Sequence, residues 1–167
     1  MMNFSLKPIG MLHSPFREAT GTPIQSATAK AVEGWVEVFP EFAPGLRDLE
    51  GFDRIWLLYW FHLTAPARLL VKPFLDQQER GVFATRSPCR PNSIGLSCVR
   101  LIGVDGNRLL IADLDFLDET PLLDIKPYVP AFDCFEARHV GWLEGKATQA
   151  VMADSRFELS ETKLKQC

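Results

Sequence analysis

The sequence predicts a single, mostly β domain that closes into a small barrel with short helical segments. The 11 glycines and 12 prolines among 167 residues divide the chain into short apolar segments bounded by turn residues. Aromatic and β-branched residues are concentrated in these segments, as is typical of strands. No segment is followed by the G-x-G-x-x-G pattern of a dinucleotide-binding sheet, so the sequence lacks the Rossmann dinucleotide fingerprint.

The amino-terminal half contains three predicted strands. Residues 4–12 and 34–39 mix apolar and polar positions, and residues 13–25 between them form a loop rich in proline and hydroxyl groups. One turn of helix is expected near residues 46–49. The third strand, residues 52–63 (FDRIWLLYWFHL), is the most apolar run, and it is expected to be central and buried on both faces.

The second half begins with two short predicted strands, residues 68–74 and 81–85. Residues 95–104 and 107–114 then flank an Asp105-Gly106 pair, which predicts a hairpin with a two-residue type I′ turn. Asp113 and Asp115 alternate with Leu114 and Phe116, the pattern of a half-solvated strand.

Residues 122–128 (LLDIKPY) are a last predicted strand, and residues 140–152 are the best candidate for a helix, although Gly141 and Gly145 weaken it. The predicted division is a barrel domain over residues 1–140 and a carboxy-terminal helix or tail, residues 141–167, packed on the barrel.

The composition excludes several classes of protein. A net charge of −3 argues against a general nucleic-acid binder, and the longest apolar run, residues 55–61, is too short for a membrane helix. The four cysteines show no C-x-x-C spacing and the three histidines lie far apart, so no disulfide framework or metal site is expected. No secretory signal is apparent, and a cytoplasmic protein is expected.

Two segments carry candidate chemistry. In residues 81–97 (GVFATRSPCRPNSIGLS), Arg86 and Arg90 flank Pro88, so a stiff loop presents two guanidinium groups, unless it is only a proline-braced connection with solvated arginines. The second segment, residues 115–133, offers a polar turn over residues 118–121. In an extended strand beyond that turn, Asp124, Lys126 and Tyr128 share one face, although a structural Asp–Lys pair would fit equally well.

These two segments resemble the signature of the TsaA-like family of tRNA-modifying methyltransferases, and residues 9–16, 21–25 and 49–62 resemble its upstream segments. The resemblance implies a small dimeric β-barrel that binds S-adenosylmethionine without a Rossmann fold. It further implies N6-methylation of threonylcarbamoyladenosine at position 37 of a threonine-accepting tRNA. No membrane partner is expected.

The resemblance also implies which residues contact the cofactor. They are Pro23, Ile24, Gln25, Phe61, His62, Leu63, Arg86, Leu96, Leu117, Asp118, Glu119 and Thr120. Two of them depart from the family pattern, because Ile24 replaces an arginine and Glu119 replaces a glycine at a turn that is expected to need a positive φ.

Methylation of the acceptor nitrogen releases a proton. One hypothesis is that Asp124, Asp133 or His62 accepts it, with Lys126 and Tyr128 orienting the base or the threonyl group; a histidine beside Phe61 in an apolar strand is otherwise a core residue. The alternative function is an S-adenosylmethionine-binding barrel without tRNA methylation, either regulatory or acting on a different acceptor.

Overall fold

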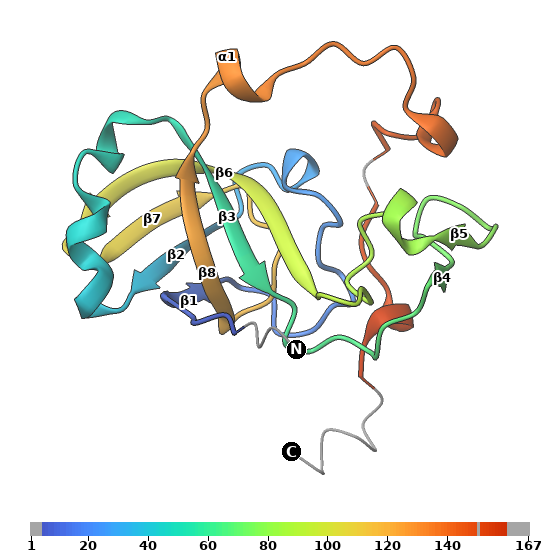
Figure 1. The fold of residues 1–167 in the computed structure, drawn as a ribbon, viewed down its shortest axis with the longest axis horizontal. Coiled ribbons are helices and arrows are strands. Elements are labelled where there is room, and N and C mark those ends of the chain that lie inside the picture. The colour runs from blue at the N-terminus through green and yellow to red at the C-terminus, as the bar shows by residue number, and fades with distance from the viewer. Residues whose placement is uncertain (1–4, 150, 160–167) are drawn as a thin grey trace.

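A computed structural model describes residues 5–149 and 151–159. Six antiparallel strands close into a barrel in the order β1-β2-β7-β6-β3-β8, which confirms the predicted small barrel (Figure 1). The strands are β1 (Gly10–His13), β2 (Glu33–Val38), β3 (Arg54–Trp60), β6 (Ile94–Asp105), β7 (Arg108–Ala112) and β8 (Thr120–Pro127). The first predicted strand is thus realised only at its end, and Phe4 lies outside the described residues.

The barrel interior is filled by the alternate residues of each strand, as the two-residue period of side chains requires. In β3, Ile55, Leu57 and Tyr59 are buried, whereas the intervening side chains are half-buried or exposed. The prediction that this strand is buried on both faces is therefore wrong. The core residues with no exposed surface include Leu12, Val36, Ile55, Leu57, Val99, Leu109, Ile111, Leu114 and Leu122.

The predicted hairpin is present as β6 and β7, but its turn lies one residue later than expected. Asp105 pairs with Arg108, so the two-residue loop is Gly106-Asn107. Only Gly106 of these two has a positive φ, 59°. A type I′ turn needs positive φ at both central residues, so this arrangement has the type II′ pattern instead.

The chain leaves the sheet immediately after Ala112, where β7 ends. Asp113 has a φ of 69° and is buried, with Arg54 Nη2 donating to its Oδ2 at 2.9 Å. Beyond it, Leu114 and Phe116 pack into the core. The half-solvated strand predicted for this stretch is wrong, because a left-handed residue breaks the alternation that the sequence pattern suggests.

A second, smaller cluster lies beside the barrel. Its strands are β4 (Leu70–Val71) and β5 (Arg80–Gly81), and a 3₁₀ turn, η4 (Val82–Ala84), replaces most of the strand predicted over residues 81–85. The strand predicted over residues 68–74 shortens to β4 alone. The cluster buries Ala65, Val71, Val82, Cys89 and Phe157.

Short 3₁₀ turns make up most of the helical structure. They are η1 (Ser26–Thr28), η2 (Pro40–Leu46), η3 (Leu49–Gly51), η5 (Gly141–Leu143) and η6 (Ser155–Phe157). The expected turn near residues 46–49 is split between η2 and η3, because Asp48 between them has a φ of 68°. Within the described residues, no helix is long and apolar enough to cross a bilayer.

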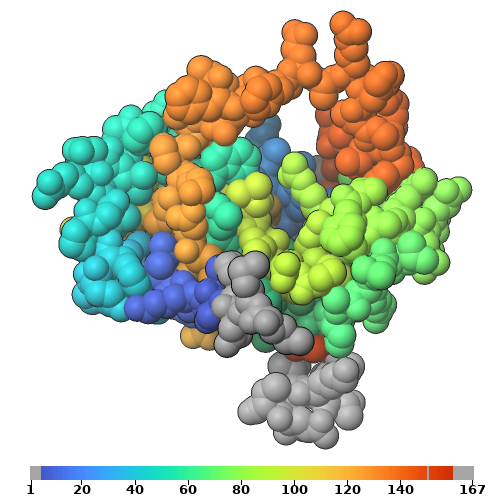
Figure 2. All heavy atoms as spheres, in the orientation of Figure 1, coloured from blue at the N-terminus to red at the C-terminus, as the bar shows by residue number. Residues whose placement is uncertain are grey.

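The helix predicted over residues 140–152 is wrong. Gly141 and Gly145 both have positive φ, at 59° and 68°, so only the single turn η5 forms. The chain from α1 (Pro130–Asp133) to η5 instead passes over the barrel as an arch, and Figure 2 shows an opening beneath it. Trp142 fastens the far end of the arch, because its Nε1 donates to Ala84 O at 2.7 Å.

The carboxy-terminal segment returns to the amino-terminal loop. Gly21 N donates to Ala153 O at 2.9 Å, and Ala153 N donates to Thr22 O at 2.8 Å. The backbone of residues 21–24 is thereby held by the carboxy-terminal segment. The division into a barrel domain over residues 1–140 and a tail over residues 141–167 stays a prediction.

Candidate functional site

Gln25 and Arg86 meet at one end of the barrel. Arg86 Nη1 donates to Gln25 Oε1 at 2.6 Å, although the two residues are 61 positions apart in the chain. Gln25 is the extended residue that precedes η1, and Arg86 is exposed between buried Thr85 and Ser87. The loop of residues 81–97 therefore presents a guanidinium group on a braced backbone, as predicted.

The second arginine of that loop has a different role. Arg90 Nη1 donates to Val82 O at 3.1 Å and to Thr85 O at 2.8 Å. Arg90 thus bonds the carbonyls at the start of η4 and just after its end, and it braces the loop from within. The expectation that the loop displays two guanidinium groups is correct for Arg86 alone.

A buried hydrogen-bonded chain lies next to this pair, and sequence reasoning missed it. Ser97 Oγ donates to Asp115 Oδ1 at 2.5 Å, and Tyr59 Oη lies 2.9 Å from Ser97 Oγ. Burial raises the pKa of Asp115 to about 6, while the Ser97 hydroxyl, the backbone amide of Ser26 and the charge of Arg86 oppose that rise. Burial also raises the pKa of Tyr59 well above its usual value, so its phenol stays protonated.

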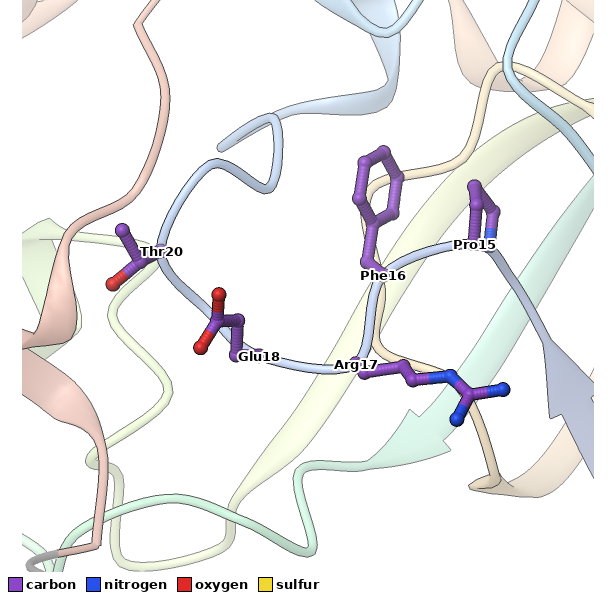
Figure 3. A pocket seen from close by; sticks show the side chains of 5 residues that line it. All are labelled: Pro15, Phe16, Arg17, Glu18 and Thr20. Atoms are coloured by element: carbon purple, nitrogen blue, oxygen red, sulfur yellow. The ribbon is translucent and has the colours of Figure 1, made fainter.

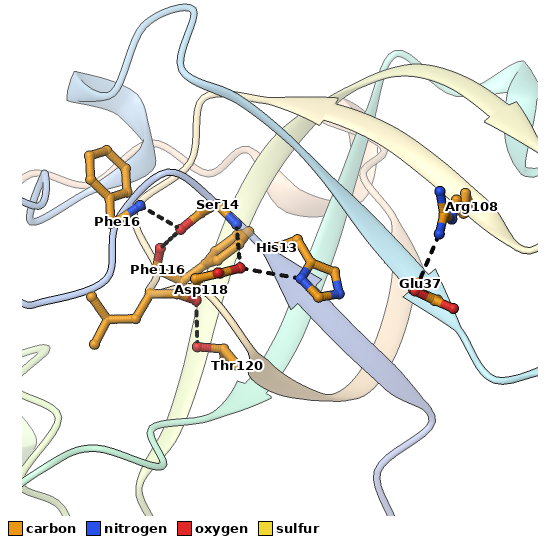
Figure 4. Close-up of polar contacts among 9 residues, drawn as sticks. His13, Ser14, Phe16, Glu37, Arg108, Phe116, Asp118 and Thr120 are labelled. Carbon is orange, nitrogen blue, oxygen red and sulfur yellow. Dashed lines mark hydrogen bonds and ion pairs between the residues drawn. The ribbon is translucent and has the colours of Figure 1, made fainter.

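Polar groups of the turn of residues 117–120 form bonds within the turn and to the end of β1 (Figure 4). Asp118 Oδ1 lies 3.2 Å from His13 Nδ1 and accepts from Ser14 N at 3.3 Å. Thr120 Oγ1 donates to Leu117 O at 2.8 Å. Asp118 is therefore fixed to the end of β1, at the same end of the barrel as the start of β8.

Glu119 occupies the left-handed region, with a φ of 57°. The expectation that this turn needs a positive φ is confirmed. For a residue with a Cβ this conformation costs about 1–2 kcal/mol, so the turn carries strain where a glycine would carry none.

Replacing Glu119 by glycine is expected to raise the free energy of unfolding by about 0.5–1 kcal/mol, because the relief of strain exceeds the extra entropy of the unfolded chain. Urea unfolding of the wild type and Glu119→Gly measures this difference. The control is Glu136→Gly, at an exposed position without positive φ, where no gain is expected. Equal loss of stability in both variants would contradict the assignment of strain to Glu119.

The predicted Phe61, His62 and Leu63 follow the end of β3. Phe61 packs edge-on against Tyr59, with ring centroids 5.3 Å apart, so it borders the buried chain. His62 lies in a turn, not in the apolar strand assumed from the sequence, and it is half-buried. Burial lowers its pKa, an effect that the nearby Glu119 opposes, so the imidazole is neutral at neutral pH.

The predicted Pro23 and Ile24 lie in the loop that the carboxy-terminal segment holds. Pro23 is buried and Ile24 is half-buried, and Ile24 N donates to Val151 O at 3.3 Å. Next to this loop is an open hollow, lined by Pro15, Phe16, Arg17, Glu18 and Thr20 (Figure 3). It adjoins the 117–120 turn, because Asp118 N donates to Phe16 O at 2.7 Å.

The four residues predicted to be catalytic lie on the outer face of the barrel. Lys126 Nζ lies 2.8 Å from Asp124 Oδ2, and the two side chains are 62% and 44% exposed. Tyr128 packs edge-on against Trp56, which is the β3 residue paired with Lys126. Asp124, Lys126 and Tyr128 thus share a face, as predicted, and the Asp–Lys pair is present too.

Leu96 and Asp133 approach the same outer face. Leu96 is 53% exposed and lies in register with Leu58, which is itself in register with Asp124 on β8. Asp133 Oδ2 accepts from Val129 N at 2.8 Å, and the charge of Asp133 acts on the Cys98 thiol of β6. Ser97 of strand β6 points into the barrel end, toward Asp115, whereas its neighbour Leu96 points outward. Strand β6 therefore lies between the residues around Asp115 and the outer face that carries Asp124 and Lys126.

A closed antiparallel barrel with an exposed guanidinium, a largely buried acid and a polar turn gathered at one end defines a ligand-binding β-barrel unrelated to the Rossmann fold. Residues 11–134 match the tRNA-methyltransferase O N-terminal domain. The chain belongs to this family, which confirms the resemblance seen in the sequence.

Named relatives agree with this assignment. A probable S-adenosyl-L-methionine-binding protein of Pyrococcus abyssi is 54% identical over 153 residues, covering 90% of this chain and 83% of that protein. The tRNA (adenine(37)-N6)-methyltransferase of Escherichia coli is 38% identical over 140 residues, covering 78% of this chain and 60% of that enzyme. A crystal structure of TrmO from Pseudomonas aeruginosa superposes with a TM-score of 0.72 at 41% identity, and the match covers 86% of this chain and 63% of that one.

Proposed function

We propose that this protein is an S-adenosylmethionine-dependent methyltransferase that methylates N6 of adenosine 37 in tRNA. The finer part of the proposal is that the acceptor is threonylcarbamoyladenosine in a threonine-accepting tRNA. The observation that carries the proposal is the meeting of Gln25 and Arg86 beside Asp115, within the residues that match the family.

The residues at the barrel end fit the cofactor chemically. S-adenosylmethionine, when bound, supplies an electrophilic methyl group on a sulfonium. The exposed Arg86 guanidinium suits a carboxylate, because guanidinium and carboxylate form strong charge-assisted hydrogen bonds. Asp118 offers an acceptor for an ammonium or ribose group, and Phe61 offers an aromatic surface.

The proton that leaves the acceptor nitrogen needs a base. His62 is neutral at neutral pH and can accept a proton. Asp124 is the other candidate, and its Oδ2 lies 2.8 Å from Lys126 Nζ. The roles of Asp124, Lys126, Tyr128, Asp133 and His62 in this step stay predictions.

The test is methyl transfer by the purified protein to threonine tRNA that carries threonylcarbamoyladenosine, followed by nucleoside mass spectrometry. One added methyl group on the modified adenosine is expected. The same tRNA transcribed without the threonylcarbamoyl group is the control and separates the two levels of the proposal. If a sample that binds the cofactor methylates neither tRNA, both the methylation of adenosine 37 and the choice of threonylcarbamoyladenosine as acceptor are contradicted.

The alternative function is cofactor binding without tRNA methylation. It is favoured by Ile24 and Glu119, which together remove one cation and add one anion relative to the family pattern. Titration of tRNA binding against salt distinguishes the two functions, because phosphate contacts impose a steep dependence on salt. Cofactor binding with no measurable affinity for tRNA supports the alternative.

We also propose that the protein is a homodimer and is cytoplasmic. Support for the dimer comes from exposed apolar side chains near the outer face, including Leu96 at 53% and Phe132 at 72% exposed. Light scattering that gives twice the chain mass is expected, and a single chain mass would contradict it. Support for the location comes from the free thiols of Cys89, Cys98 and Cys134.

A further inference from the structure

Asp115 connects the segments that are expected to contact the cofactor. Its carboxylate accepts from Ser97, the neighbour of Leu96, and faces the backbone amide of Ser26, the neighbour of Gln25. Asp115 itself precedes the 117–120 turn by two residues. One largely buried carboxylate therefore joins a strand, a loop and a turn that are distant in sequence.

The hydrogen bonds to Asp115 favour its charged form, whereas burial raises its pKa to about 6. Tyr59 keeps its proton and can donate to Ser97 Oγ, which leaves the Ser97 hydroxyl to donate to Asp115. Each of these two hydrogen bonds favours the charged form of the Asp115 carboxylate, which is the final acceptor. The carboxylate thus accepts from Ser97 of β6, and the amide of Ser26 in η1 and the charge of Arg86 also favour its charged form.

We propose that charged Asp115 is a positioning residue, which holds the Ser26 backbone and thereby sets Gln25 against Arg86 for cofactor binding. This inference rests on the proposed function, because it assumes that Arg86 contacts the cofactor. Asp115 acts through Ser26, Gln25 and Arg86 and does not need to touch the cofactor itself.

A pH-dependent affinity follows from this arrangement. The groups that face Asp115 are Tyr59 from β3, Ser97 from β6, the Ser26 amide from η1 and Arg86 from the loop after η4. Arg86 is the charged member of this group. The pKa of Asp115 is about 6, so protonation below that pH weakens the attraction between its carboxylate and the Ser26 amide.

The test compares the dissociation constant of S-adenosylmethionine for the wild type and Asp115→Asn by calorimetry between pH 5 and 8. Wild-type affinity is expected to be constant above pH 7 and to fall below about pH 6. Asp115→Asn is expected to bind about tenfold more weakly at pH 7.5, with no further change across this range beyond that of the ligand. Asp105→Asn, exposed at the β6–β7 turn, is the matched control and is expected to follow the wild type.

Ser97→Ala provides a second test, a shift in the pH dependence of cofactor affinity. A purely structural role of Asp115 would not produce such a shift. The Ser97 hydroxyl lowers the pKa of Asp115, so its removal is expected to move the midpoint of the affinity profile to higher pH. This variant keeps the carboxylate and serves if Asp115→Asn does not fold.

Stability provides the remaining readout. The pKa of Asp115 in the folded protein lies above its ordinary value of 3.8, so the native state binds more protons and its stability falls as the pH rises from about 4 to about 6. At pH 7.5 the ionised carboxylate therefore costs stability, and Asp115→Asn is not expected to melt below the wild type.

If the wild type binds the cofactor and Asp115→Asn binds it with the same affinity and the same pH profile, this inference is wrong and the proposed function is unaffected. An unmoved midpoint in Ser97→Ala would overturn this inference as well. Absence of binding by the wild type at every pH would overturn the proposed function and this inference with it.

Discussion

Arg86→Ala is expected to weaken S-adenosylmethionine binding by about 10- to 100-fold, because a hydrogen bond to a charged group contributes about 1.5–3 kcal/mol. Arg86 is exposed and donates to Gln25 at 2.6 Å, so its removal costs little packing. The free energy of unfolding is therefore expected to stay close to that of the wild type. Calorimetric titration and urea unfolding of the same preparation measure both quantities.

Two further variants make this result specific. Arg108→Ala removes an exposed guanidinium near Glu37 at the hairpin end of the barrel, and no change in binding is expected. Arg90→Ala removes the guanidinium donor from the carbonyls of Val82 and Thr85, so it is expected to lower stability as well as binding. If Arg86→Ala bound the cofactor as Arg108→Ala does, Arg86 would not be a cofactor contact.

Gly95→Ala is expected to lower the free energy of unfolding by about 2–3 kcal/mol, because overpacking a tight core site forces neighbouring side chains to move. Gly95 lies opposite Tyr59 in the β3–β6 ladder, and a Cβ there would fall inside the van der Waals radius of the Tyr59 ring. That ring cannot move freely, because Phe61 and Phe116 pack against it and its hydroxyl contacts Ser97.

The same strand supplies the control for this prediction. Gly103→Ala adds a Cβ with no atom within 4 Å, so its effect on unfolding is expected to stay within about 0.5 kcal/mol. Gly95→Ala is also expected to weaken cofactor binding, since displacement of Tyr59 disturbs the Ser97–Asp115 bond. Equal urea midpoints for the two variants would refute the close approach of Gly95 to Tyr59.

The barrel and much of the site could be predicted from local sequence features. Alternating apolar residues in β2 and the Asp-Gly-Asn stretch between β6 and β7 act within a few residues, so their structural consequence is visible in the sequence. The positive φ at Glu119 was accessible because a turn places a local steric demand on one residue. The shared face of Asp124, Lys126 and Tyr128 followed from the two-residue period of a strand.

Other features depend on contacts between distant segments, and the amino-acid pattern alone does not contain them. Asp113 adopts a left-handed conformation while Arg54, 59 residues away, bonds its carboxylate, and the next acid, Asp115, is then largely buried. Arg86 and Arg90 look equivalent in sequence, yet only the folded loop supplies Arg90 with two carbonyls and leaves Arg86 to Gln25. Local sterics and side-chain period thus set the strands and turns, whereas burial and long-range hydrogen bonds decided which polar groups form the site.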